Sequence, residues 1–158
     1  MTKIVVGVDG SPESHRAMQW ALRQAHCLDA EVVAVHVFTY TIPDRPDSAV
    51  GRPEVLEDVI AHAERRAGKV VDEAVDAAGD LAKGVEVIAR VIRGREPPEH
   101  LLREAEDADL LVLGSRGLGG FKKLLLGSVS QKCMDYAPCT VLIVRGPVPG
   151  HDAPQAGG

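Results

Sequence analysis

The chain alternates short apolar, β-branched runs with longer stretches in which apolar residues recur every three or four positions. Five apolar runs predict strands, over residues 4–8, 31–37, 85–91, 110–113 and 141–144. Between them, helical periodicity predicts helices over residues 14–27, 54–78, 97–108 and 129–136. Strands that alternate with helices in this way form βαβ units, whose strands pair in parallel. The sequence therefore predicts one α/β domain with an open, parallel five-stranded sheet and helices on both faces.

Three segments differ from this pattern. The run 85–91 alternates polar with apolar residues, which favours a strand at the edge of the sheet. Residues 38–53 are polar and contain three prolines, so they predict a surface excursion. Residues 146–158 are rich in proline and glycine and poor in apolar residues, so they predict a flexible tail after a domain over residues 1–145.

Composition and charge exclude several classes of protein. The 158 residues carry 18 basic and 23 acidic side chains, a net charge of −5, which disfavours binding to nucleic acid. No apolar stretch approaches the ~18 residues of a membrane span, and the first residues lack the pattern of a signal peptide. Three cysteines form no disulfide framework or zinc motif. We therefore expect a cytoplasmic protein with no membrane or nucleic-acid partner.

A glycine-rich segment follows the fourth predicted strand. Its glycines at 114, 117, 119 and 120 allow positive φ angles and a close approach of the backbone to a ligand. A further glycine and serine, Gly127 and Ser128, open the next helix, and Ser128 or Ser130 is predicted to cap it. Free amides in the first turn of a helix, together with the helix dipole, bind anions. The alternative is a surface loop whose glycines serve only as turns.

The charge of this segment is opposite to that of the rest of the chain. Residues 114–130 contain Arg116, Lys122 and Lys123 and no acidic residue, so the segment carries +3 and the remainder −8. A local basic pocket favours a phosphate-bearing ligand. The segment is not a Walker A loop, because Gly120 and Phe121 stand where that motif has lysine and a hydroxyl residue. We therefore expect binding of a phosphate, with any hydrolysis slow and incidental.

Asp9 directly follows the first predicted strand. A carboxylate at the carboxyl end of a central strand can accept hydrogen bonds from a ribose hydroxyl or an adenine amino group, or help to hold a divalent ion. The alternative is an Asp-Gly-Ser turn, in which Asp9 or Ser11 bonds to backbone amides. Both can hold at once. His36, within the second predicted strand, is expected to be a hydrogen-bonded core residue.

Four stretches together resemble the universal stress protein family. They are Val6-Gly7-Val8-Asp9-Gly10-Ser11, His36-Val37, Gly114-x2-Gly117-x9-Gly127-Ser128, and Ala137 through Val144. The likeness covers about residues 3–145, in the same order and with the same spacing. It implies the flavodoxin- or Rossmann-like fold of the adenine nucleotide alpha hydrolase type.

The same resemblance implies a binding site for ATP, because the spaced glycine motif marks the members that bind it. It places Gly7 and Asp9 at the adenine and ribose, and Val37 at the adenine through its backbone. It places Gly114 and Gly117 against the ribose and phosphates. Gly127, Ser128 and Val129 would donate to the phosphates. The site is completed from the same segment by Ser115, Arg116 and Ser130, where Arg116, like Lys122, is chosen for its charge.

The resemblance implies a homodimeric sensor or regulator of the stress response that binds ATP, alone or with Mg²⁺, and is not an enzyme. In the family the fifth strand commonly pairs across a dimer, and the run from Val141 to Val144 suits that use because an unpaired edge invites strand addition. Three alternatives are kept. One is an interaction module that binds no nucleotide, another is a member that binds cyclic AMP, and the third, disfavoured, is a true ATPase.

Overall fold

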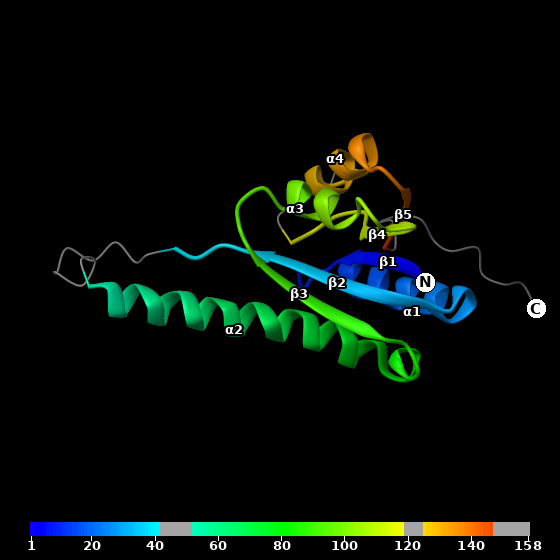
Figure 1. Ribbon diagram of the computed structural model, residues 1–158. Helices are drawn as coiled ribbons and strands as arrows, with labels where there is room; N and C mark the ends of the chain where they lie inside the picture. The colour runs from blue at the N-terminus through cyan, green and yellow to red at the C-terminus, as the bar shows by residue number, and fades with distance from the viewer. Residues whose placement is uncertain (42–51, 119–124, 147–158) are drawn as a thin grey trace, which may run out of the picture.

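The computed structural model describes residues 1–41, 52–118 and 125–146, and its elements alternate between strand and helix (Figure 1). The strands are β1 (Thr2–Gly7), β2 (Ala30–Phe38), β3 (Val87–Arg93), β4 (Leu110–Gly114) and β5 (Thr140–Val144). The helices are α1 (Pro12–Leu28), α2 (Pro53–Ala78), α3 (Pro97–Glu104) and α4 (Ser128–Tyr136), with a short 3₁₀ helix, η1 (Gly79–Ala82), after α2.

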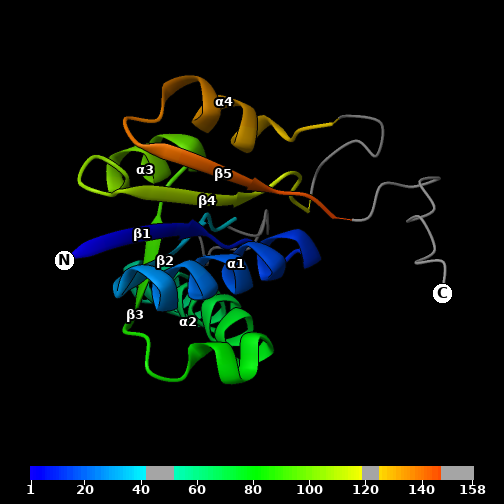
Figure 2. The ribbon, with the colours of Figure 1, turned by 90° about the vertical axis from the view of Figure 1, so that its right-hand side faces the viewer.

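The five strands form one parallel sheet in the order β3-β2-β1-β4-β5. Figure 2 shows α1 and α2 on one face of the sheet and α3 and α4 on the other. The predicted α/β class, the parallel sheet and the edge position of the third strand are therefore confirmed. The chain runs from β1 outward to β3 and then returns to the other side of β1 as β4, so the strand order reverses between β1 and β4.

Burial on both faces explains why the first strand is a continuous apolar run. Ile4 and Val6 pack in the core beneath α1 and α2, and Val5 packs in the core beneath α3 and α4. All three side chains are fully buried. A central parallel strand covered on both faces has no solvent side for polar residues, so the polar/apolar alternation of an exposed sheet is absent.

All nine predicted strands and helices are present, with shifted ends. The helix predicted to reach residue 108 ends at Glu104. Hydrogen bonds between β1 and the segment after the helix explain this earlier end. The Asp109 amide donates to the Lys3 carbonyl at 2.9 Å, and the Lys3 amide donates to the Asp109 carboxylate at 2.9 Å. The chain must leave the helix to make these bonds beside β1. The helix α1 begins two residues earlier than predicted, at Pro12, because Ser11 caps it.

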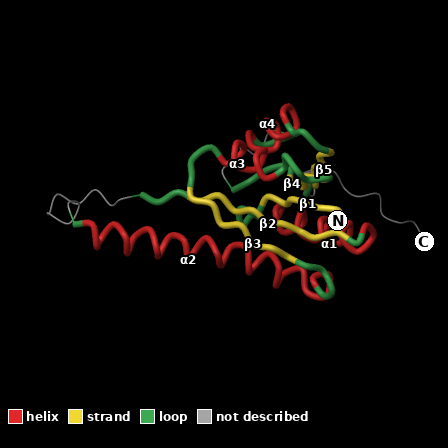
Figure 3. The backbone as a smooth tube through the Cα atoms, viewed as in Figure 1, coloured by secondary structure: helices red, strands yellow, loops and turns green. Residues whose placement is uncertain are grey.

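The helix α2 extends past the edge of the sheet that the carboxyl ends of the strands form, called the carboxyl edge below (Figure 3). Its stop at Gly79, where φ is +57°, agrees with the prediction. Most of the predicted excursion 38–53, the tail 147–158, and Lys122 lie outside the described residues. None of the described helices is both long and apolar enough to cross a membrane.

Candidate functional site

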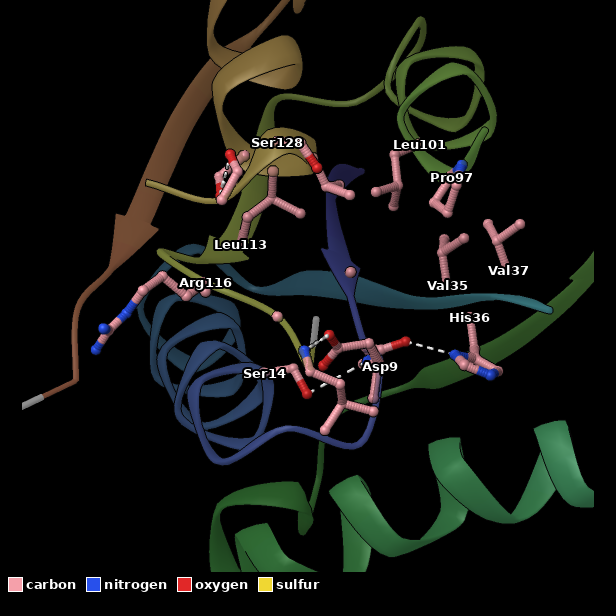
Figure 4. A pocket seen from close by; sticks show the side chains of 18 residues that line it. Asp9, Ser14, Val35, His36, Val37, Pro97, Leu101, Leu113, Arg116 and Ser128 are labelled. Atoms are coloured by element: carbon pink, nitrogen blue, oxygen red, sulfur yellow. Dashed lines mark hydrogen bonds between the residues drawn. The ribbon is translucent and has the colours of Figure 1, made fainter. Parts of the chain in front are cut away.

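A cavity of about 410 Å³ lies at the carboxyl edge, where β1 and β4 send the chain in opposite directions. Ligands of open α/β sheets bind at such a reversal of strand order. The lining comes from the ends of β1, β2 and β4 and the starts of α3 and α4 (Figure 4). The lining residues are Gly7, Val8, Asp9, Ser14, Val35, His36, Val37, Pro97, Leu101, Leu113, Gly114, Arg116, Gly117, Leu118, Gly127, Ser128, Val129 and Ser130.

One end of the cavity is apolar. Val35 and Val37 belong to the apolar cluster beneath α3 and α4, together with Leu101 of α3 and Leu113 of β4. Gly7 lies between them, and a Cβ atom there would come within 2.6 Å of Leu113 Cδ2 and 3.3 Å of Leu101 Cδ2. Glycine at this position therefore lets the two leucines close over the end of β1. The result is an apolar surface suited to a flat, uncharged ring.

The other end carries backbone donors from the start of α4. The N-cap of α4 is Gly127, and no side chain caps the helix. Within the part of the chain that the structure describes, the amides of Ser128, Val129 and Ser130 have no hydrogen-bond acceptor, and all three residues line the cavity. Unpaired first-turn amides at the positive end of a helix dipole form an anion site.

Ser115 holds this helix start against the end of β4. Its carbonyl accepts from the Gly127 amide at 2.6 Å and from the Ser130 hydroxyl at 3.0 Å, and its own amide donates to the Val144 carbonyl at 2.9 Å. Ser115 is buried and does not line the cavity. The expectation that Ser128 or Ser130 caps α4 is wrong, because the Ser130 hydroxyl donates back to carbonyls and no cap bond forms.

Asp9 connects the turn after β1 to the loop after β4. Its Oδ1 accepts from the Ser11 amide at 2.9 Å, which is the predicted Asp-Gly-Ser turn. Its Oδ2 accepts from the Leu118 amide at 3.1 Å, a bond across 109 residues of sequence (Figure 4). A carboxylate has about four acceptor sites, so two are used and the rest can accept from a ligand.

The glycines near the cavity are explained by space rather than by backbone angle. Among the described residues, positive φ at glycine occurs at positions 10, 79 and 84, so the expected positive φ is wrong for Gly114 and Gly117. A Cβ at 114 would lie 2.8 Å from Glu13 Cβ, and one at 117 would lie 2.5 Å from Asp9 Oδ2. At 127 the nearest atom is 3.4 Å away. The glycines at 119 and 120 lie outside the described residues.

Arg116 and His36 line the cavity in different ways. In Figure 4 the Arg116 side chain extends away from the labelled apolar side chains. The ring of His36 is 2.7 Å from the Val8 carbonyl through Nδ1, and because a carbonyl only accepts, Nδ1 carries the proton. His36 is hydrogen-bonded, as expected, but it is half-buried at the cavity and not in the core.

Ten of the eleven predicted site residues line this one cavity, and Ser115 alone does not. Sequence reasoning missed the lining contributed by Ser14 and by Pro97 and Leu101 of α3. Pro97 could have been found, because it opens the helix that follows a strand ending at the same edge. Ser14 gives no such signal, since its hydroxyl accepts from the Asp9 amide at 3.3 Å and donates to the Ser11 carbonyl at 2.9 Å only once α1 has formed.

Comparison with known proteins finds one family along the chain. The model of the "Universal stress protein family" matches residues 1–145. A universal stress protein of Thermus aquaticus is 38% identical over 144 residues, which cover 90% of this chain and 97% of that protein. A universal stress protein of Mycolicibacterium smegmatis is 32% identical, and the match spans 90% of this chain but only 48% of that longer protein.

A solved structure gives the same result in three dimensions. The chain is similar to a universal stress protein solved in complex with cAMP, with 31% sequence identity and a TM-score of 0.63. The match covers 90% of this chain and 96% of the other. Sequence and fold therefore agree over the region that contains the cavity.

Proposed function

The chain belongs to the universal stress protein family, and from this premise we propose that it binds an adenine nucleotide, ATP foremost, at the carboxyl edge of its sheet. The observation that carries the proposal is the pairing of two unlike ends in one cavity. The unpaired amides of Ser128, Val129 and Ser130 face the same space as the apolar surface around Leu101 and Leu113. A nucleotide combines a flat base with an anionic end, so it complements both ends at once.

This arrangement gives the bound nucleotide one orientation. The base lies against Val35, Val37 and Leu113, and the backbone of Val37 is available to its polar edge. The phosphates lie at the start of α4, where the amides and the helix dipole stabilise negative charge. The ribose then lies near Asp9, whose remaining acceptor sites suit hydroxyl donors.

Mg²⁺ would come with the phosphates. Among the described residues no group of three or more His, Cys, Asp or Glu side chains could hold a metal ion. Asp9 is the one carboxylate among the described lining residues, so phosphate oxygens and water would supply most of the ligands. Mg²⁺ would neutralise phosphate charge near this carboxylate.

We place the protein among nucleotide-dependent sensors or regulators of the stress response, in the cytoplasm, and not among enzymes. None of the described lining residues is a lysine that could stabilise a transferred phosphoryl group. The Asp9 carboxylate already accepts from two backbone amides, so the protein itself occupies two of its acceptor sites. Any hydrolysis would be slow.

The proposal includes a homodimer that pairs through β5. This strand lies at one edge of the sheet, so one row of its backbone groups has no partner strand among the described residues of the monomer. Met134 and Tyr136, near the end of α4 just before β5, are 46% and 70% exposed. Light scattering should give a mass of about twice 16.8 kDa. A monomer at micromolar concentration would contradict this part of the proposal.

Cyclic AMP is the second candidate ligand. The observation in its favour is the similar universal stress protein solved in complex with cAMP. Both nucleotides share the base and an anionic end, and they differ in the charge and length of that end. The number of phosphate oxygens that the amides of α4 can bind therefore determines which of the two nucleotides binds more tightly.

The test is a calorimetric titration of the dialysed protein with ATP plus Mg²⁺, with AMP and with cyclic AMP. We expect heat from at least one of the three, with ATP binding most tightly. Acid denaturation of freshly purified protein, followed by mass spectrometry, identifies any ligand carried through purification. If none of the three binds and no nucleotide is released, the proposal fails, and an interaction module that binds no nucleotide takes its place.

A further inference from the structure

We propose that Gly117 is glycine because the Asp9 carboxylate fills the space beside it, and that Gly117 and the Leu118 amide together position this carboxylate in the cavity. Gly117 is then a positioning residue that acts through Asp9, in addition to any contact with a ligand. The consequence for nucleotide affinity depends on the proposed function. The consequence for the ligand-free protein does not.

The contacts of Gly117 are confined to one side chain. A Cβ atom there would lie 2.5 Å from Asp9 Oδ2 and 3.7 Å from Asp9 Cγ, and apart from its chain neighbours no other heavy atom of the described residues lies within 4 Å. Real Cβ atoms do not approach an oxygen to 2.5 Å, so any residue with a side chain at 117 forces Asp9 to move. The fold would otherwise tolerate that side chain, because Gly117 is exposed.

The same oxygen accepts the neighbouring amide. Asp9 Oδ2 accepts from the Leu118 amide at 3.1 Å, and Oδ1 accepts from the Ser11 amide at 2.9 Å. The carboxylate is thus held from both sides of the crevice between β1 and β4. A side chain at 117 that displaces Oδ2 also breaks the bond to Leu118. Hydrogen bonds to a charged group are about twice as strong as those between neutral groups, so the loss is measurable.

The other two glycines of the motif provide the contrast. Gly114 faces the main chain of Glu13, whose carbonyl carbon would be 2.9 Å from a Cβ, so no change of a side chain relieves that contact. Gly127 has only ordinary contacts, and the three atoms nearest to a Cβ there belong to Arg116, Ser115 and Ser130, at 3.4 to 3.6 Å. Gly127→Ala is therefore the matched control for Gly117→Ala.

The first experiment measures hydrogen exchange at the Leu118 amide in the ligand-free protein by NMR. We expect protection in the wild type and in Gly127→Ala. We expect at least about a tenfold loss of protection in Gly117→Ala and in Asp9→Ala, since a lost bond to a charged acceptor exceeds 1.4 kcal/mol. The double variant should lose no more than either single variant. An unchanged exchange rate at Leu118 in Gly117→Ala would overturn the proposal.

The second experiment applies the same double-mutant cycle to nucleotide affinity. If Gly117 acts through Asp9, Gly117→Ala weakens ATP binding by about tenfold in the wild-type background and by less than about twofold in the Asp9→Ala background. If Gly117→Ala lowers ATP affinity equally in the wild-type and Asp9→Ala backgrounds, the added methyl group hinders the ligand directly and does not act through Asp9. That result would overturn the proposal. If the wild type binds no nucleotide, the proposed function fails while the exchange experiment still decides the role of Gly117.

Discussion

Two helices, α1 and α4, begin at the same edge of the sheet, but only α4 presents its amides to the cavity. In α1 the first residue is Pro12, which has no amide hydrogen, and the Ser11 hydroxyl accepts from the Ser14 amide at 3.1 Å. In α4 the first residue is Ser128, and the N-cap, Gly127, has no side chain to offer. The comparison teaches that a helix start keeps its first amides available to an anion when it has neither a side-chain cap nor a proline.

The third helix start at this cavity supports the same rule. The helix α3 begins with Pro97 and Pro98, so its first two positions have no amide hydrogen to donate. Pro97 contributes apolar surface to the cavity. In the proposed binding mode, the start of α3, which has lost its amide donors, lies at the base end of the cavity, and the start of α4, which has kept them, lies at the anion end.

The largest effect should follow from giving α4 the proline that the other helices have. Ser128→Pro removes one amide at the first helical position, where proline is favoured, and Gly127 already has the extended conformation (φ −75°, ψ 164°) that precedes proline. Loss of one bond to a charged phosphate costs about 1.5–3 kcal/mol, so calorimetry should show ATP binding weakened by about 10- to 100-fold.

The matched control is Ser128→Ala, which changes the side chain and keeps the amide. Since no side chain caps α4, this variant should bind within about twofold of the wild type. The anion site would lie elsewhere if Ser128→Pro, folded as judged by circular dichroism, bound ATP as tightly as Ser128→Ala.

A smaller effect, on stability alone, is expected at the start of α1. Ser11→Ala removes the cap and leaves the buried Ser14 amide without an acceptor, so urea unfolding should show a loss of about 1–2 kcal/mol. The Ser11 amide still donates to Asp9, so nucleotide affinity should stay within about twofold. A large loss of affinity in a stably folded variant would show that the two helix starts are not independent.

The smallest effect concerns the thiol within α4. Burial raises the pKa of Cys133 to about 11, so at pH 8 it holds little of the reactive thiolate and reacts only when the helix opens. In a Cys27→Ser/Cys139→Ser background, ATP bound at the start of α4 should slow iodoacetamide labelling of Cys133 by a few-fold, roughly as local opening is suppressed. In the Ser128→Pro variant ATP at the same concentration should protect the thiol less. Equal protection in both would place the ligand away from α4.

The fold was predictable because its signals are local. The continuous run at Ile4 to Val6 indicates a strand buried on both faces, and the alternation around Arg90 indicates an edge strand, which is where β3 lies. The starts of the helices were less certain. Ser11 caps α1, which therefore begins two residues before the start that the periodicity predicts. The end of α3 was also misjudged, because the backbone hydrogen bonds of Lys3 with Asp109 require the chain to leave the helix early.

The candidate site was predictable as a set of residues and less so as a mechanism. The spaced glycines and Asp9 do come together at one cavity. The expected positive φ was wrong for Gly114 and Gly117, and the space that these glycines leave for Glu13 and Asp9 depends on atoms 101 and 108 residues away along the chain. The cap expected from Ser128 or Ser130 failed because the carbonyl of Ser115 attracts the Ser130 hydroxyl.

For this protein, apolar periodicity and the glycine-rich segment after the fourth predicted strand, both properties of neighbouring residues, were enough to determine the class of fold and to predict the edge of the sheet at which a ligand would bind. Only the tertiary structure decided which helix start keeps its amides unpaired, which side chains would crowd a Cβ at Gly7 or Gly117, and how Asp9 reaches Leu118. These features depend on contacts between segments far apart in the chain, and the geometry of such contacts exists only after the strands have taken their places in the sheet.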